Sequence, residues 1–139
     1  MFAAALVCMA LNIYHEARDQ PFIGQVAVAQ VVMNRVADDR YPDNVCDVVT
    51  QGPTYSWKPD FPVRHRCQFS WYCDGKSDKT PDLTAWEQAM MIAQGVHTGN
   101  LDDFVEGATH YHATYVLPEW AETKTPVVQI GEHMFYRWE

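Results

Sequence analysis

The sequence predicts a mainly helical α+β domain with a small antiparallel sheet and long loops. Three segments show the three- and four-residue apolar spacing of helices. Two segments near the end of the chain alternate polar and apolar residues as strands do. A stretch rich in Pro, Gly, Asp and aromatic residues separates the second helical segment from the third, which indicates functional loops. The chain has 139 residues, so we expect one domain spanning residues 1–139.

Two helices open this domain. The first covers residues 3–17, where five apolar residues recur on one helical face: Leu6, Met9, Ala10, Ile13 and Ala17. The second covers residues 21–36, because Pro21 suits the first turn of a helix. This second segment is apolar almost all round, which predicts a central, buried helix. A short turn and helix follows, carrying Val45, Val48 and Val49.

The rest of the chain predicts loops, a third helix and two strands. Residues 51–80 have the composition of long loops, with one short strand at 67–71. The third helix covers residues 82–97, which place apolar side chains three and four positions apart on one face. The alternating segments 108–116 and 127–136 are the two strands. We expect them to pair as the small antiparallel sheet.

Composition and charge exclude several classes of protein. The sequence is 47% hydrophobic, 20% charged and 13% aromatic, which is typical of neither disordered, collagenous nor coiled-coil proteins. The 10 basic and 18 acidic residues give a net charge of -8, which disfavours nucleic-acid binding and docking on anionic membranes. No apolar run approaches the roughly 18 residues of a membrane span. We therefore expect neither a nucleic-acid partner nor membrane insertion. We also expect a monomer, although no feature of the sequence indicates the oligomeric state.

The four cysteines are too few and too unevenly spaced for a disulfide scaffold. Cys8 lies in an apolar helical run, which favours a small buried hydrophobe. Cys67 is expected to pair with Cys46 or Cys73, which would suit an oxidising compartment. No C-x2-C pair indicates a zinc site. Residues 1–11 are apolar but lack a basic start and an A-x-A exit, so they predict a helix of the mature fold rather than a signal peptide.

Glu16 is the most informative chemical residue. It lies three residues after Ile13 and seven after Met9, at the edge of the apolar face and in the last turn of the first helix. Burial and the negative helix end should both raise the pKa of its carboxyl group. A carboxylic acid that stays protonated near neutral pH is suited to general acid catalysis. The position also suits a structural Glu that pairs with a distant Arg or His.

Other polar side chains could support or line a site. Gln30 and Asn34 share one side of the second helix and could orient Glu16 or hold loop backbone. Gln68, Phe69 and Ser70 could give a sugar hydrogen bonds and a stacking face. Several aromatic residues offer flat surface of the kind that sugars stack on, although core packing explains them equally well: Trp57, Trp71, Tyr72, Trp120 and Tyr136.

Two histidines mark the first strand. Strand alternation predicts His110 and His112 on one face and Tyr111 on the other. The pair could hold a metal ion with His15 or His133, but no H-E-x-x-H motif or third ligand at motif spacing supports this. We therefore expect no metal. A role in lining a substrate cleft and plain packing both remain open for these residues.

Four blocks of the sequence resemble, in order, the SleB-like cell wall hydrolases, the family of the spore-cortex-lytic enzymes. The first is IYHEAR with the following GQVAVAQVVMNRV, and the others are CQFSWYCDG, GATHYHA and IGEHMFYR, at residues 13–36, 67–75, 107–113 and 130–137. The resemblance extends from about Ala10 to Arg137. It implies a lysozyme-like, transglycosylase-type domain without a cofactor. It also implies cleavage of the β-1,4 bond between N-acetylmuramic acid and N-acetylglucosamine in peptidoglycan glycan strands.

The resemblance assigns the catalytic acid to Glu16 and implies a lytic transglycosylase that leaves a 1,6-anhydromuramoyl end. Ordinary glycosidases use two carboxyl groups. No second acidic residue in the sequence has a placement comparable with that of Glu16, and a transglycosylase needs only one. We expect Gln68, Ser70, Tyr111 and His112 to position the sugar and its N-acetyl groups. His110 and Tyr136 would support them.

Three other activities stay open: a hydrolytic muramidase at the same site, a metal-dependent amidase or peptidase using His110, His112 and His15, and an inactive sugar-binding module. The charge of -8 disfavours long-range attraction to an anionic wall, so binding should depend on local contacts. We expect action in the cell wall or periplasm, without a separate wall-binding domain. No export signal is visible, which suggests a phage lysin released through membrane pores or part of a longer exported protein.

Overall fold

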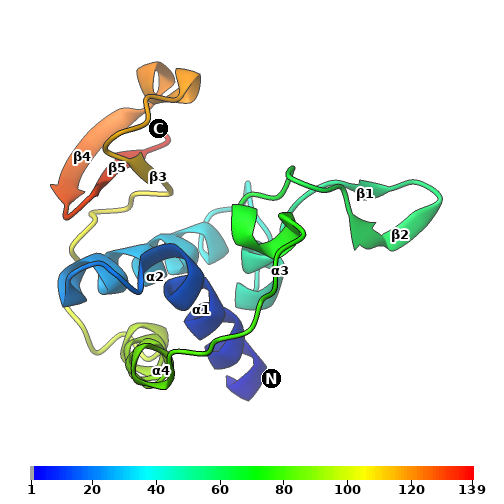
Figure 1. Cartoon of the computed structure of the whole chain (residues 1–139). Helices are drawn as coiled ribbons and strands as arrows, with labels where there is room; N and C mark the ends of the chain where they lie inside the picture. The colour runs from blue at the N-terminus through cyan, green and yellow to red at the C-terminus, as the bar shows by residue number, and fades with distance from the viewer. Residues whose placement is uncertain (1) are drawn as a thin grey trace.

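Four α-helices form the body of the molecule in a computed structural model that describes residues 2–139. They are α1 (Phe2–Ala17), α2 (Phe22–Val36), α3 (Val45–Val49) and α4 (Leu83–His97). Helix α1 packs against the other three, and α2 also contacts α3 and α4 (Figure 1). Residues of all four helices fill the main core, including Met9, Ile13, Val26, Val48 and Ile92. The predicted helices are confirmed to within a residue or two at each end.

Local sequence sets where the helices begin. Pro21 precedes α2 as its N-cap residue, one position outside the helix rather than in its first turn. The side chain of Asn44 accepts a hydrogen bond from the backbone N–H of Asp47 at 2.9 Å and caps α3. Asp82 caps α4 in the same way, by accepting from Ala85 at 3.1 Å. Such caps satisfy N–H groups that the first helical turn leaves without partners.

A three-stranded antiparallel sheet packs along one side of α2. Its strands are β3 (His110–Ala113), β4 (Thr125–Ile130) and β5 (His133–Arg137), with β5 in the middle (Figure 1). The 3₁₀-helix η2 (Glu119–Thr123) lies between β3 and β4 in sequence. The single strand expected at 127–136 is a hairpin instead, because the chain reverses at Gly131, which has φ +56°. Phe135 packs against Val28, Val31 and neighbouring residues in a second core cluster.

The segment 51–80 contains a hairpin and a 3₁₀-helix among its loops. Strands β1 (Thr54–Tyr55) and β2 (Lys58–Pro62) form a hairpin that projects from the body (Figure 1). The strand expected at 67–71 is wrong, since Ser70–Cys73 form the 3₁₀-helix η1. The reason is a disulfide between Cys67 and Cys73 that makes the chain turn back within six residues. Trp71 Nε1 also donates to Asn12 Oδ1 at 2.9 Å and fixes this turn on α1.

Two disulfides account for all four cysteines. Cys67 is bonded to Cys73, one of its two expected partners. The other expected partner, Cys46, is bonded to Cys8, so the interpretation of Cys8 as a free buried hydrophobe is wrong. Packing of α3 on α1 brings the two Cα atoms to 5.2 Å, within the range of disulfides. The 38-residue separation of these cysteines gives no local signal of this contact.

These bridges predict a simple result in thiol titration. The denatured, unreduced protein is expected to have no free thiol, and the reduced protein four. Reduction of Cys8–Cys46 alone should lower the free energy of unfolding by about 3 kcal/mol, because the bridge closes a long loop in the unfolded chain. Two free thiols in the unreduced protein would contradict the pairing of Cys8.

No helix in the described part of the chain is long and apolar enough to cross a membrane.

Candidate active site

Glu16 lies in the last turn of α1, where the helix meets the sheet. Its side chain is half-buried, and its Oε1 accepts a hydrogen bond from the hydroxyl group of Tyr111 in β3. The half-buried position of Glu16 agrees with the helical spacing, which predicts this residue at the edge of the apolar face of α1. Tyr111 belongs to the face of the sheet that packs on the helices, since its ring contacts Phe69 and Phe135.

Burial dominates the electrostatics of Glu16. Loss of hydration raises the pKa of its carboxyl group above the ordinary value for Glu. The hydrogen bond from Tyr111 and the positive charge of Arg35 both favour the carboxylate and partly oppose this shift. Burial, and after it the neighbouring carboxyl group of Glu16, raises the pKa of Tyr111 well above its ordinary value. Tyr111 is therefore a neutral hydroxyl donor at physiological pH.

Arg35 is a residue of the candidate site that sequence reasoning missed. It is 5% exposed, and burial lowers the pKa of its guanidinium. Its Nε donates to the carbonyl of Thr109 at 2.7 Å, and its Nη1 donates to Gln68 Oε1 at 3.4 Å. The ring of Phe69 lies 5.1 Å from the guanidinium carbon. The sequence could have indicated this buried cation, because Arg35 lies in a helical segment that is apolar almost all round.

Of the three residues Gln68, Phe69 and Ser70, the structure contradicts the expectation for Phe69 alone. Gln68 is exposed and is joined to the site through Arg35. Phe69 is 3% exposed and belongs to the main core, so it offers no stacking face to a sugar and that expectation is wrong. Ser70 is exposed at the start of η1.

Gln30 and Asn34 hold loop backbone, which was one of the two roles expected. Gln30 Nε2 donates to the carbonyl of Asp102 at 2.6 Å, and Gln30 Oε1 accepts from Phe104 N–H at 3.0 Å. Asn34 Nδ2 donates to the carbonyl of Ala108 at 2.8 Å. These bonds fix the segment that leads into β3, and so they place Tyr111 indirectly.

His110 and His112 lie on the opposite face of the sheet from Tyr111, as strand alternation predicted. His112 Nδ1 donates to the carbonyl of Ala113 at 2.7 Å, and its Nε2 lies 2.8 Å from the hydroxyl of Tyr136. The rings of His110, His112 and Tyr136 all contact Trp120. The expectation that His112 positions a sugar beside Glu16 is therefore wrong, because its ring packs on the other side of the strand.

The hypothesis of a metal centre also finds no site. His110 Nδ1 lies 2.9 Å from Thr109 Oγ1, and burial lowers the pKa of His110 to about 4. Within residues 2–139 as described, no three His, Cys, Asp or Glu side chains are grouped to hold a metal ion. The two histidines instead support the sheet, together with Tyr136.

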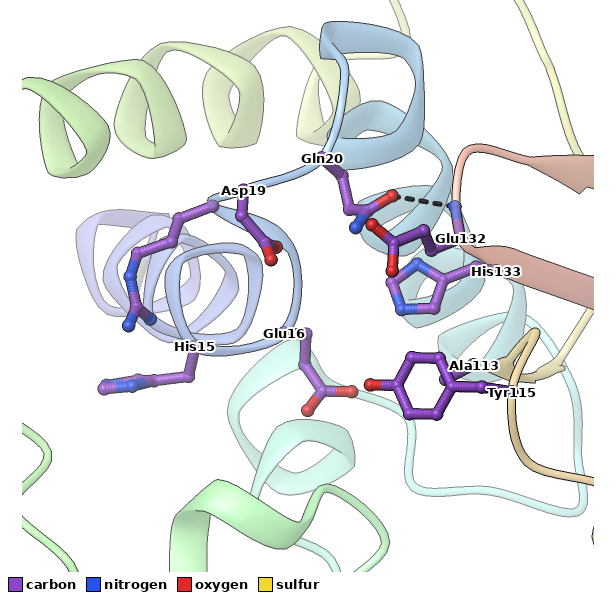
Figure 2. A pocket seen from close by; sticks show the side chains of 9 residues that line it. His15, Glu16, Asp19, Gln20, Ala113, Tyr115, Glu132 and His133 are labelled. Carbon is purple, nitrogen blue, oxygen red and sulfur yellow. Dashed lines mark hydrogen bonds between the residues drawn. The ribbon is translucent and has the colours of Figure 1, made fainter.

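Glu16 opens onto a cleft of about 260 Å³ between the end of α1 and the sheet (Figure 2). Nine residues line it: His15, Glu16, Arg18, Asp19, Gln20, Ala113, Tyr115, Glu132 and His133. Gln20 Oε1 accepts from the backbone N–H of Glu132 at 2.9 Å, which ties the α1–α2 turn to the β4–β5 turn. We call this space the Glu16 cleft.

The cleft contains two further acidic residues, Asp19 and Glu132. Glu16 is therefore not the single acidic residue of the cleft, whereas the sequence indicated no second acid with a comparable placement. No local pattern predicts that Glu132 lies near Glu16, because 116 positions separate the two residues. Both additional carboxylates are exposed, whereas Glu16 is half-buried. Burial raises the pKa of Glu16.

His133 and Tyr115 complete the cleft wall and were not expected there. His133 is 9% exposed, and burial lowers its pKa, so its ring is neutral at physiological pH. Its ring centre lies 5.0 Å from that of Tyr111. Tyr115 is 80% exposed at the mouth of the cleft, opposite α1 (Figure 2). An exposed aromatic ring beside a polar cleft is a surface on which a sugar can stack.

The fold and this site define a lysozyme-like α+β domain in which one partly buried carboxyl group faces an open polar cleft. A sequence model of the Cell Wall Hydrolase family matches residues 19–136. The chain therefore belongs to the cell wall hydrolase family. Glu16 precedes the matched range by three residues, so the family match does not include it.

Solved structures of similar fold come from the same family. The catalytic domain of the Bacillus cereus SleB protein has a TM-score of 0.68 and 27% identity, with 97% of this chain and 91% of that chain covered. The catalytic domain of the germination-specific lytic transglycosylase SleB from Bacillus anthracis has a TM-score of 0.69 and 27% identity, with 96% and 93% covered.

Curated relatives are longer than this chain. The spore cortex-lytic enzyme of Halalkalibacterium halodurans is 32% identical over 128 residues, which are 91% of this chain and 33% of that protein. The spore cortex-lytic enzyme of Bacillus subtilis is 26% identical over 127 residues, 91% of this chain and 35% of that protein. The chain thus spans about a third of the length of these relatives.

Proposed function

We propose that this domain is a lytic transglycosylase that cleaves the β-1,4 bond between N-acetylmuramic acid and N-acetylglucosamine in peptidoglycan. One observation carries the proposal: a half-buried Glu16 with a raised pKa faces an open polar cleft. The similar catalytic domain from Bacillus anthracis belongs to a germination-specific lytic transglycosylase.

The proposed reaction uses Glu16 twice. The protonated carboxyl group donates its proton to the glycosidic oxygen as the bond from C1 of the muramoyl sugar to that oxygen breaks. The resulting carboxylate then accepts the proton of the C6 hydroxyl while that oxygen bonds to C1. The products are a 1,6-anhydromuramoyl end and a free N-acetylglucosamine end, and no water is consumed. The C6 hydroxyl competes well with water because it belongs to the same sugar.

Tyr111 and Arg35 would assist the two proton transfers through their interactions with Glu16. The hydroxyl of Tyr111 donates to Glu16 and would hold the carboxyl group in one orientation during both proton transfers. Arg35 favours the ionised form of Glu16, so its charge would stabilise the carboxylate that forms after the first transfer. Both are positioning residues in this scheme.

A hydrolytic muramidase is the second candidate, and Asp19 and Glu132 favour it. Each presents an exposed carboxylate to the Glu16 cleft. In an inverting glycosidase, a second carboxylate activates a water molecule on the far side of the sugar. The transglycosylase remains our proposal because burial raises the pKa of Glu16, as an acid catalyst requires, and that reaction needs no second carboxyl group.

Mass spectrometry of the soluble products tests the proposal. We expect muropeptides from purified peptidoglycan to carry 1,6-anhydro ends, one water lighter than reducing ends, and cleavage to continue in EDTA. Reducing ends in place of anhydro ends would overturn the transglycosylase in favour of the muramidase. Loss of cleavage in EDTA, restored by added metal, would instead favour a metal-dependent enzyme.

We further propose that the enzyme acts outside the cytoplasmic membrane. Its substrate lies there, and two disulfides suit an oxidising compartment. Release as a phage lysin and export within a longer protein both stay predictions, as does the monomeric state.

A further inference from the structure

A second cavity of about 380 Å³ adjoins the Glu16 cleft, and we call it the basic pocket. It is lined by Tyr14, His15, Arg18, Ser77, Lys79 and Pro81. His15 and Arg18 line both spaces, so the two are neighbours across the end of α1. The basic pocket has no acidic residue in its lining, although the chain contains 18 acidic residues and only 10 basic ones.

The loop that carries Lys79 is fastened to α1 at two points. His15 Nε2 donates to the carbonyl of Asp78 at 3.2 Å. The backbone N–H of Asp82 donates to the hydroxyl of Tyr14 at 3.1 Å. The ring of His15 also stacks on Trp71, with 4.7 Å between the ring centres. These contacts hold the loop beside Arg18, so the pocket is a built feature of the fold.

Both cations in the basic pocket are without an acidic partner. The ion pairs among the described residues join Arg40 to Asp38 and Arg137 to Glu139. Arg18 instead donates Nη1 to the carbonyl of Tyr14 at 3.3 Å, and its guanidinium carbon lies 4.8 Å from the centre of the Tyr14 ring. This orients Arg18 while leaving most of its N–H groups available. A fixed guanidinium beside a free ammonium group is suited to binding a carboxylate.

We propose that the basic pocket binds a carboxylate of the stem peptide on the muramoyl sugar at the cleavage site. This inference rests on the proposed function. The stem peptide is attached through a lactyl group to O3 of that sugar and carries free carboxyl groups. When the scissile bond lies at Glu16, the exposed carboxylates of Asp19 and Glu132 repel such a carboxylate from the Glu16 cleft. Arg18 and Lys79 attract it into the adjoining basic pocket.

Kinetics on two substrates test this subsite. Glycan strands that carry stem peptides are compared with the same strands after the peptides are removed by an amidase. For Arg18→Gln/Lys79→Gln we expect KM to rise about tenfold on peptide-bearing strands, because two charge-assisted contacts are lost. On peptide-free strands the rise in KM should be smaller, because Arg18 also lines the Glu16 cleft. Lys79 lines the basic pocket and not the Glu16 cleft, so Lys79→Gln should raise KM on peptide-bearing strands and leave kcat and the KM on peptide-free strands unchanged. High salt should reduce the wild-type preference for peptide-bearing strands.

A matched control separates the pocket from overall charge. Arg66→Gln/Lys76→Gln removes the same two charges from exposed side chains outside both cavities, and we expect wild-type KM values. Lys79→Gln alone gives a second test if the double variant folds poorly, since the Lys79 side chain makes no hydrogen bond or ion pair in the structure. Equal KM changes on both substrates, or the same change in the control, would overturn the subsite.

A binding measurement makes the result independent of cleavage. Calorimetry with the Glu16→Gln protein would compare N-acetylmuramoyl-L-alanyl-D-glutamate with the same compound after its carboxyl groups are amidated. We expect the free acid to bind about fivefold more tightly, and Arg18→Gln/Lys79→Gln to remove this difference. Equal affinities would refute the subsite even if wild-type products carry anhydro ends. Reducing ends with a retained difference would refute the transglycosylase alone.

Discussion

Replacing Glu16 by Gln is expected to lower kcat on peptidoglycan by about 10³-fold, because a positioned general acid contributes rate factors of this order. The amide has the shape of the carboxyl group and can still accept the hydrogen bond from Tyr111, so the fold should be retained. Turbidity loss of wall suspensions measures the rate, and circular dichroism measures the fold. An active Glu16→Gln protein would contradict the assignment of the acid.

The effect of this substitution on stability has a definite sign. The folded-state pKa of Glu16 is raised, so ionisation costs stability as pH rises from the unfolded-state pKa through the folded-state value. Glu16→Gln removes that cost. We therefore expect its Tm at pH 8 to equal or exceed that of the wild type, whereas at pH 4 the difference should vanish.

Asp19→Asn and Glu132→Gln are the matched controls in the same cleft. Both carboxylates are exposed and no step of the proposed reaction uses them, so we expect kcat within about threefold of the wild type. A loss in Glu132→Gln as large as that in Glu16→Gln would indicate a two-carboxylate hydrolase.

Arg35→Gln is expected to lower the free energy of unfolding by about 3 kcal/mol, the second large effect. The substitution leaves the carbonyl of Thr109 and the amide of Gln68 without their donor inside the protein. Denaturant unfolding measures the loss. Arg137→Gln is the control, because its partly exposed ion pair with Glu139 should contribute less than about 1 kcal/mol. Equal losses in the two variants would contradict the role of Arg35.

Tyr111→Phe tests whether the hydrogen bond from Tyr111 affects the pKa of Glu16. It removes the hydrogen bond that favours the ionised form of Glu16, so the pKa of Glu16 should rise further. The active form is the protonated acid, and activity falls as pH rises through that pKa. The alkaline limb of kcat/KM should therefore move to higher pH in Tyr111→Phe. A limb that moves to lower pH would refute the coupling of these two groups.

The spacing of apolar and polar residues predicted those features of the molecule that depend on a single helix or strand. The spacing of Met9, Ile13 and Glu16 fixes their common side of α1 without knowledge of the rest of the fold. Strand alternation likewise separated Tyr111 from His110 and His112. These predictions needed only the helical and strand periods, which are properties of the backbone.

Most of the failures concern which elements contact one another. Periodicity placed His112 on a face of its strand but could not say which face would turn toward Glu16. Cys8 was assigned to a helix, and the contact of that helix with Cys46 was invisible in the sequence. Glu132 enters the Glu16 cleft because a hairpin at Gly131 brings its turn to the α1–α2 connection. Such contacts between distant elements depend on how all the core side chains pack together, which the periodicity of one element does not show.

The most direct test is the pKa of the Glu16 side chain in the free enzyme, measured by carbon-detected NMR on protein labelled at Glu, with Glu16→Gln to assign the signal. We expect a value clearly above the roughly 4.3 of an unperturbed Glu, and an alkaline limb of kcat/KM at the same pH. A Glu16 that titrates at or below that ordinary value, in an enzyme whose activity persists well above it, would contradict a catalytic acid kept protonated by burial.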